Sequence, residues 1–273
     1  MKKNTDTFEL KRFGETVRKY AGEHWRSLAM KAGVMTGIFI IATIFIVVNT
    51  RNYFEAVNSY YSFYGEDPSL DIFWFLLQAA FILCGVISAS MTFGDLSTKE
   101  TRLNELTVPA AQSEKFLTRW LFYVPGFVVV FTVAAAVSEM LRFGLLSAVV
   151  ECPEKVRLLN PAYMMTDSDG ISTECQLTVL SFLCLQSLFM LGSIVWHKAS
   201  FVKTFLALGL IASAYFFIGY FTVVLLDLSP ESRFPLPKNA MLIVAYCLTA
   251  FIVVFCYAVA WIRYKEMEII NRW

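Results

Sequence analysis

Six long runs of apolar residues, separated by polar intervals, dominate the hydrophobic pattern of this chain. Several of these runs hold 17 or more nearly uninterrupted apolar residues, and an α-helix needs about 20 such residues to cross a bilayer. The pattern therefore predicts an all-α, polytopic membrane protein whose transmembrane domain covers residues 31–262. The six predicted transmembrane helices span about 32–48, 71–93, 120–138, 177–196, 205–226 and 240–262.

Residues 1–30 form an N-terminal region with a helical pattern of their own. Phe13, Val17, Ala21 and Trp25 recur every four residues, while the basic residues lie largely off that stripe. This pattern is typical of an amphipathic helix that lies in the membrane interface. A solvated cytoplasmic tail is the alternative interpretation.

Composition and charge support a membrane protein and predict its orientation. Charged residues make up 16% of the chain, whereas soluble domains contain roughly 25%. Of the 23 Lys and Arg residues, 17 lie in the first 31 residues, in the intervals 94–119 and 197–204, and in the tail 263–273. Because Lys and Arg accumulate on the cytoplasmic side of membranes, we expect both termini in the cytoplasm. The net charge of +1 gives no indication of a nucleic-acid partner.

The sequence shows few residues arranged for catalysis, cofactor binding or metal binding. The two histidines, His24 and His197, have no partner at the spacing of a metal site, and the sequence contains no P-loop and no Gly-x-Ser-x-Gly motif. Asp71, Glu139 and Asp227 fall at the ends of predicted spans, which disfavours ion-driven transport. Neutral polar residues inside spans either join helices or line a transport path. We therefore expect no enzymatic activity and no catalytic, cofactor-binding or metal site in this chain.

The polar interval 94–119 has the densest mixture of charges and helix signals. Ser97 and Glu100 are spaced as a capping box that would begin a short helix. Pro109 would interrupt that helix, and a second helix is expected to begin near Ala110. The interval is thus predicted to form a compact cytoplasmic knob that transmits force from a soluble partner.

The longest outer interval, 139–176, is expected to hold a helix from Met140 to Val150 that lies on the outer surface. It also contains Cys152 and Cys175. These two cysteines are candidates for a disulfide if this side of the membrane is oxidising. Two unrelated thiols are the alternative.

Residues 106–120, LTVPAAQSEKFLTRW, resemble the cytoplasmic loop of small six-span ABC transporter permeases of the exporter (type-2) class. Gly192-Ser193 with the segment 197–204 resembles the region that opens the fifth span of these permeases, and residues 263–268 resemble their basic tail. Two features depart from the family pattern. Ala111 stands where the family commonly has serine, and the longest outer interval follows the third span instead of the fifth.

The resemblance implies a permease subunit of an exporter in the bacterial cytoplasmic (inner) membrane. Two permease chains, as a homodimer or heterodimer, would work with separate ABC ATPase subunits that bind ATP and Mg²⁺. Closure of the ATPases would rock the bundles between inward- and outward-facing arrangements. In this family the loop between the second and third spans docks on the ATPase, and the candidate docking residues are Leu103, Glu105, Leu106, Pro109, Glu114, Lys115 and Phe116.

Other interpretations stay open at this point. Phe116 and Trp120 are alternatively interfacial anchors of the third span. The whole chain is alternatively an accessory or sensor protein that binds a different soluble partner without transport. A membrane enzyme that acts on lipid is a third class, but no nucleophile, base or metal set converges in the sequence. The exported substrate is not specified by any motif.

Overall fold

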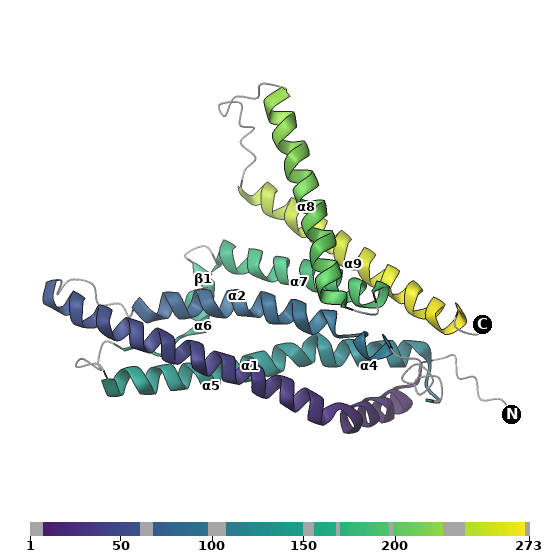
Figure 1. Ribbon diagram of the computed structural model, residues 1–273, viewed down its shortest axis with the longest axis horizontal. Helices are drawn as coiled ribbons and strands as arrows, with labels where there is room; N and C mark the ends of the chain where they lie inside the picture. Colours follow the sequence, from purple (N-terminus) through teal and green to yellow (C-terminus); the bar gives the residue numbers. More distant parts are fainter. Residues whose placement is uncertain are drawn as a thin grey trace. The chain divides into compact units, whose positions relative to one another are not determined.

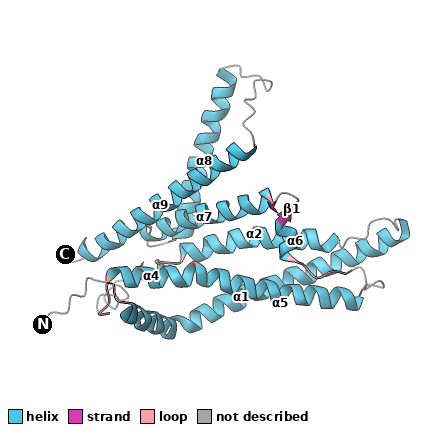
Figure 2. Cartoon of the chain, turned by 180° about the vertical axis from the view of Figure 1, so that it is seen from behind, coloured by secondary structure: helices cyan, strands magenta, loops and turns pink. Residues whose placement is uncertain are grey.

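The computed structural model describes residues 8–60, 68–97, 108–149, 156–167, 170–196, 199–225 and 238–270. These residues are mainly helical (Figures 1 and 2). Besides the helices they contain a 3-10 turn, η1, and a two-residue antiparallel pairing between β1 and β2. The elements in chain order are α1 (Leu10–Tyr60), α2 (Pro68–Ser90), η1 (Gly94–Ser97), α4 (Gln112–Tyr123), α5 (Pro125–Val149), α6 (Pro161–Met165), β1 (Thr166–Asp167), β2 (Gly170–Ile171), α7 (Thr173–Val195), α8 (Ser200–Leu225) and α9 (Lys238–Ile270).

Six helical segments of the described chain are long and apolar enough to cross a membrane. Each of the six predicted spans overlaps one of them, so the prediction of a helical, multi-pass membrane protein is confirmed. Most of the helices exceed the predicted lengths because polar residues at their ends continue the helical backbone, whereas α2 ends at Ser90, before the predicted end at Phe93. The segments are Leu10–Thr50, Ser69–Ser90, Gln112–Val149, Thr173–Val195, Ser200–Thr222 and Leu242–Glu266.

Two boundaries differ from the predictions. The N-terminal helix and the first span form one uninterrupted helix, α1, because no helix-breaking residue separates them. The helix expected from Met140 as a separate element is instead the last part of α5, which is continuous from Pro125 to Val149. Whether the first turns of α1 lie in the membrane interface stays a prediction.

The described residues fall into two units by their internal contacts, and each is considered by itself. The first helical unit is built on Thr7–Gly85 and Trp120–Thr178, and the second contains Val86–Arg119 and Val179–Trp273. In the first unit α1 and α5 lie side by side (Figure 1).

Aromatic side chains fill much of the interior of the first unit. Phe131 of α5 lies edge-on to Phe39 of α1, with ring centroids 5.3 Å apart, and edge-on to Phe81 of α2 at 5.1 Å. Tyr20 packs on Phe122 with centroids 5.0 Å apart, which extends the contact to the N-terminal turns of α1. Such edge-to-face pairs contribute about 0.5–1.5 kcal/mol each beyond the area they bury.

In the second unit Gly192 of α7 lies directly against Thr204 of α8. A Cβ atom added at Gly192 would lie 2.0 Å from Oγ1 of Thr204 and 2.9 Å from its Cβ. Small residues allow membrane helices to approach this closely, and van der Waals contact then holds them together.

We predict that Gly192→Ala lowers the free energy of unfolding by about 1–3 kcal/mol, because the added methyl group overpacks the contact between α7 and α8. Adding Thr204→Ala should restore part of the loss, since it removes Oγ1 and Cγ2 from the crowded space. Gly209→Ala is the matched control, because nothing lies within 4 Å of the methyl group it would add. Denaturant titration in mixed micelles measures all three, and equal effects at Gly192 and Gly209 would contradict the prediction.

Candidate functional site

The first flank of the 94–119 interval turns sharply at the end of α2. Thr92 donates its hydroxyl hydrogen to the Ala89 carbonyl at 2.8 Å, and the Gly94 N–H donates to Met91 O at 3.2 Å. Phe93, 1% exposed, is directed into the protein by this turn. The chain then enters η1, and residues 98–107 lie outside the described part of the structure.

The second flank is the start of α4, where Glu114 caps its own helix. Its Oε2 atom accepts the Ala111 N–H at 3.0 Å, while the Glu114 N–H donates to Ala111 O at 3.0 Å. This is one half of a capping box, and the carboxylate also lies at the positive end of the helix dipole. α4 therefore begins at Gln112, within two residues of the predicted start.

The two flanks of the interval contact each other. Arg119 on α4 donates from Nη1 to the Thr92 carbonyl at 3.4 Å, and both residues are buried. Phe93 and Phe116 stack with ring centroids 5.6 Å apart. Residues that are 23 or more positions apart in the sequence thus close the base of the interval.

The C-terminal part of α9 completes this base. Phe116 lies edge-on to Trp261 with centroids 5.3 Å apart, and Tyr264 contacts Phe93 at 5.6 Å and Phe116 at 5.7 Å. Lys265 places its ammonium group 4.8 Å from the centroid of the Trp261 ring. We name Phe93, Phe116, Trp261 and Tyr264 the loop-base cluster. No motif in the sequence predicts this cluster, although the i, i+3 spacing of Trp261 and Tyr264 places both rings on one helix face.

The structure assigns the predicted docking residues to different environments. Pro109 is exposed, whereas Glu114 and Lys115 are buried at 0% and 6% exposure. Phe116 is half-buried within the loop-base cluster. The carboxylate of Glu114 supports the chain's own helix, so charge reversal there would break the cap as well as any docking contact. The other predicted members, Leu103, Glu105 and Leu106, lie outside the described residues, and docking stays a prediction.

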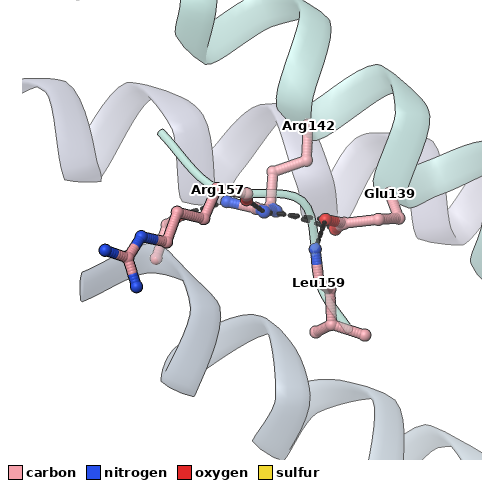
Figure 3. A network of polar contacts seen from close by, with 5 residues as sticks. Glu139, Arg142, Arg157 and Leu159 are labelled. Atoms are coloured by element: carbon pink, nitrogen blue, oxygen red, sulfur yellow. Dashed lines mark hydrogen bonds and ion pairs between the residues drawn. The ribbon is translucent and has the colours of Figure 1, made fainter. Parts of the chain in front are cut away.

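A second polar cluster, in the first unit, surrounds Arg142 of α5 (Figure 3). Its side chain is 0% exposed. The guanidinium forms a bidentate ion pair with Glu139, from Nε to Oε2 at 2.8 Å and from Nη2 to Oε1 at 2.7 Å. Nη2 also donates to the Arg157 carbonyl at 2.7 Å, and Nη1 donates to the Ser69 hydroxyl. Glu139 Oε1 accepts the Leu159 N–H at 2.7 Å. The network therefore joins α5, the start of α2 and the segment that leads to α6.

Glu139 directly follows the predicted third span, and the structure shows that the helix α5 continues past residue 138 to Val149, with Glu139 and Arg142 both in it. The Glu139 carboxylate pairs with Arg142, its neighbour one turn away. The i, i+3 spacing of opposite charges was the signal available in the sequence. Only the tertiary structure showed that both are buried, because their remaining partners come from distant segments.

Of the two candidate disulfide cysteines, the structure describes only Cys175. Cys175 is buried near the start of α7, and Cys152 lies outside the described residues, so their disulfide stays a prediction. Among the described residues, no group of three or more His, Cys, Asp or Glu side chains is arranged to hold a metal ion.

We predict that Glu139→Leu destabilises the chain by about 3–5 kcal/mol, because it leaves the Arg142 charge buried without its carboxylate. The double variant Glu139→Leu/Arg142→Met should be more stable than Glu139→Leu, since it removes both charges. Arg263→Met is the matched control: it breaks an i, i+3 pair with Glu266 whose side chains are 60% and 44% exposed. Unfolding midpoints in detergent measure these effects, and a double variant no more stable than Glu139→Leu would disprove the argument.

We also predict that Ala111→Ser stabilises the start of α4 by about 1 kcal/mol, because a hydroxyl at the N-cap accepts a backbone N–H of the first turn in addition to the bond that the Glu114 N–H already makes to the carbonyl of residue 111. Hydrogen exchange of the amides at 113–115 should slow. Ala110→Ser, one residue before the cap, is the control and should leave these amides unchanged. The same slowing in both variants would show that the cap geometry is not the cause.

Comparison of the chain with protein-family models, with curated proteins and with solved structures finds no match in any of the three. The functional assignment therefore depends on the residues and contacts described above.

Proposed function

We propose that this chain is the membrane-spanning permease subunit of an ATP-driven ABC exporter in a bacterial cytoplasmic membrane. Both termini would face the cytoplasm. Two permease chains, identical or different, would assemble with separate ATPase subunits that bind ATP and Mg²⁺ and dock on the 94–119 interval. The observation that carries the proposal is the closed base of this interval, between the second and third candidate membrane helices.

A loop that receives force from a soluble partner has to move together with the helices that it joins. Arg119 and Thr92 connect its two flanks through a buried hydrogen bond, and Phe93 and Phe116 add an aromatic contact beside it. The Glu114 cap fixes the first turn of α4. A push on such a loop is passed on as rigid-body movement and is not absorbed by bending of its ends.

The buried charges are consistent with an external source of energy. Charged residues inside membrane segments usually mark ion pathways when they face a water-filled cavity. Arg142 instead directs its guanidinium at Glu139, at Ser69 and at the Arg157 carbonyl, so its position has a structural explanation. Energy supplied by ATP hydrolysis in a partner needs no charge relay in this chain.

The test is affinity purification of the tagged chain from native membranes in mild detergent, followed by mass spectrometry. We expect a P-loop ATPase in stoichiometric amount. Recovery of the chain alone, or with a soluble partner that is not an ATPase, would overturn the proposal and favour the accessory or sensor function.

The same purification tests the docking surface. Pro109→Glu should reduce the recovered ATPase several-fold, because it places a charge on an exposed position of the interval without touching the Glu114 cap. Ile171→Glu is the control: Ile171 is 63% exposed and belongs to the interval predicted to face the other side of the membrane. Equal recovery with both variants would exclude docking at Pro109.

A further inference from the structure

We propose that α9 is the helix to which the 94–119 interval passes its movement. We call the contact between the interval and α9 the joint, and Phe116 and Tyr264 are its positioning residues. This inference rests on the proposed function and deepens it, since it assigns the mechanical output of the docking loop to one membrane helix. The loop-base cluster, together with the uneven burial of α9, carries the argument.

The joint has two contacts from the loop to Tyr264. One comes from Phe93 at the first flank and the other from Phe116 at the second, with ring centroids 5.6 Å and 5.7 Å from Tyr264. Tyr264 is 2% exposed, so both contacts are buried. Because the flanks are also joined to each other through Arg119, the loop cannot shift without carrying the Tyr264 ring with it.

The buried face of α9 is confined to its C-terminal part. Cys256, Ala260 and Tyr264 are 2%, 1% and 2% exposed, and their i, i+4, i+8 spacing places them on one helix face. Earlier in the helix, Ile243 and Phe251 are 62% and 68% exposed. α9 is therefore held by protein near its C-terminal end and presents apolar side chains outward before that.

Because α9 is held near its C-terminal end, its other end can act as the long arm of a lever. The helix from Lys238 to Tyr264 contains 27 residues, and its length is about 39 Å at a rise of 1.5 Å per residue, which exceeds the hydrocarbon thickness of a bilayer, about 30 Å. A small rotation at the loop-base cluster becomes a larger displacement at the far end of α9. The hydrogen bond from Tyr257 Oη to Gln186 Oε1 of α7, at 3.0 Å, supplies a contact about which the helix turns.

A second contact joins the end of α2, just before the loop-base cluster, to α8. Ser200, the first residue of α8, donates its hydroxyl hydrogen to Ser90 O at the end of α2 at 2.8 Å. This bond holds the start of α8, and it is a single bond from a side chain to a backbone carbonyl. The aromatic joint to α9 has four rings and direct contacts from both flanks, so we assign the principal output to α9.

Trp and Tyr near the end of a membrane helix are commonly anchors at the lipid headgroups. The environment of Tyr264 argues against that role here, because its ring is buried against Phe93 and Phe116 and is not available to lipid. Trp261 is half-buried and Lys265 lies over its ring, so the outer side of the cluster is covered by the chain itself.

The experiment measures hydrogen–deuterium exchange of the purified complex of chain and ATPase, with and without ATP and vanadate. Wild-type complex should show nucleotide-dependent changes in peptides from both α4 and the exposed part of α9. Tyr264→Ala should keep the ATPase bound and keep the change in α4, but lose the change in α9. Tyr264→Phe, which retains the ring, should restore it, and Phe251→Ala on the same helix should behave as wild type.

Persistence of the nucleotide-dependent change in α9 of the Tyr264→Ala complex would overturn the proposal. Loss of the change in α4 as well, or no restoration by Tyr264→Phe, would also overturn it, because a purely structural role predicts those results. If wild-type chain is recovered without an ATPase, the proposed function fails and the joint is tested in the chain alone. Phe116→Ala should then raise exchange in residues 257–266, and Tyr264→Ala should raise it in residues 112–119; no reciprocal effect would exclude the joint.

Discussion

Backbone hydrogen bonding in a medium without water is the constraint on which this structure depends. Each buried N–H and C=O group needs a partner from the chain, and a helix supplies those partners within one segment. The described apolar segments accordingly form helices, and α1 and α5 continue past the predicted ends of their spans. At Pro125, where one N–H is missing, the chain keeps flanking bonds from Val124 to Trp120 O and from Val128 to Val124 O at 2.9 Å and 3.3 Å.

Once the helices exist, the hydrophobic effect no longer distinguishes a helix contact from a lipid contact, and more specific interactions hold the units together. Close packing does so at Gly192 and Thr204, and a polar bond does so between Tyr257 and Gln186. The Arg142 network is the strongest case, because separating that buried charge from its partners costs several kcal/mol. It fixes the chain after α5 to two helices of the same unit.

The loop-base cluster connects this architecture to function. Its rings come from the turn after α2, from α4 and from α9, so residues from three parts of the chain meet at the interval that the proposed ATPase would contact. The buried Glu114 caps α4 and the exposed Pro109 lies just before it. The described part of the interval thus combines an exposed residue, Pro109, with a base closed by buried contacts.

The sequence by itself determined the number and approximate positions of the membrane helices, because span length and hydropathy are local properties of the chain. It also located the start of α4, since Pro109 and Glu114 act on their immediate neighbours. It treated Glu114 and Lys115 as surface contacts and did not show that Glu139 is buried, because burial depends on segments distant in the sequence. Only the tertiary structure brought Ser69 and the Arg157 carbonyl to Arg142, and Tyr264 to Phe93 and Phe116. Contacts between helices depend on which faces meet, and an apolar helix that is hydrophobic on every side carries no local signal of that choice.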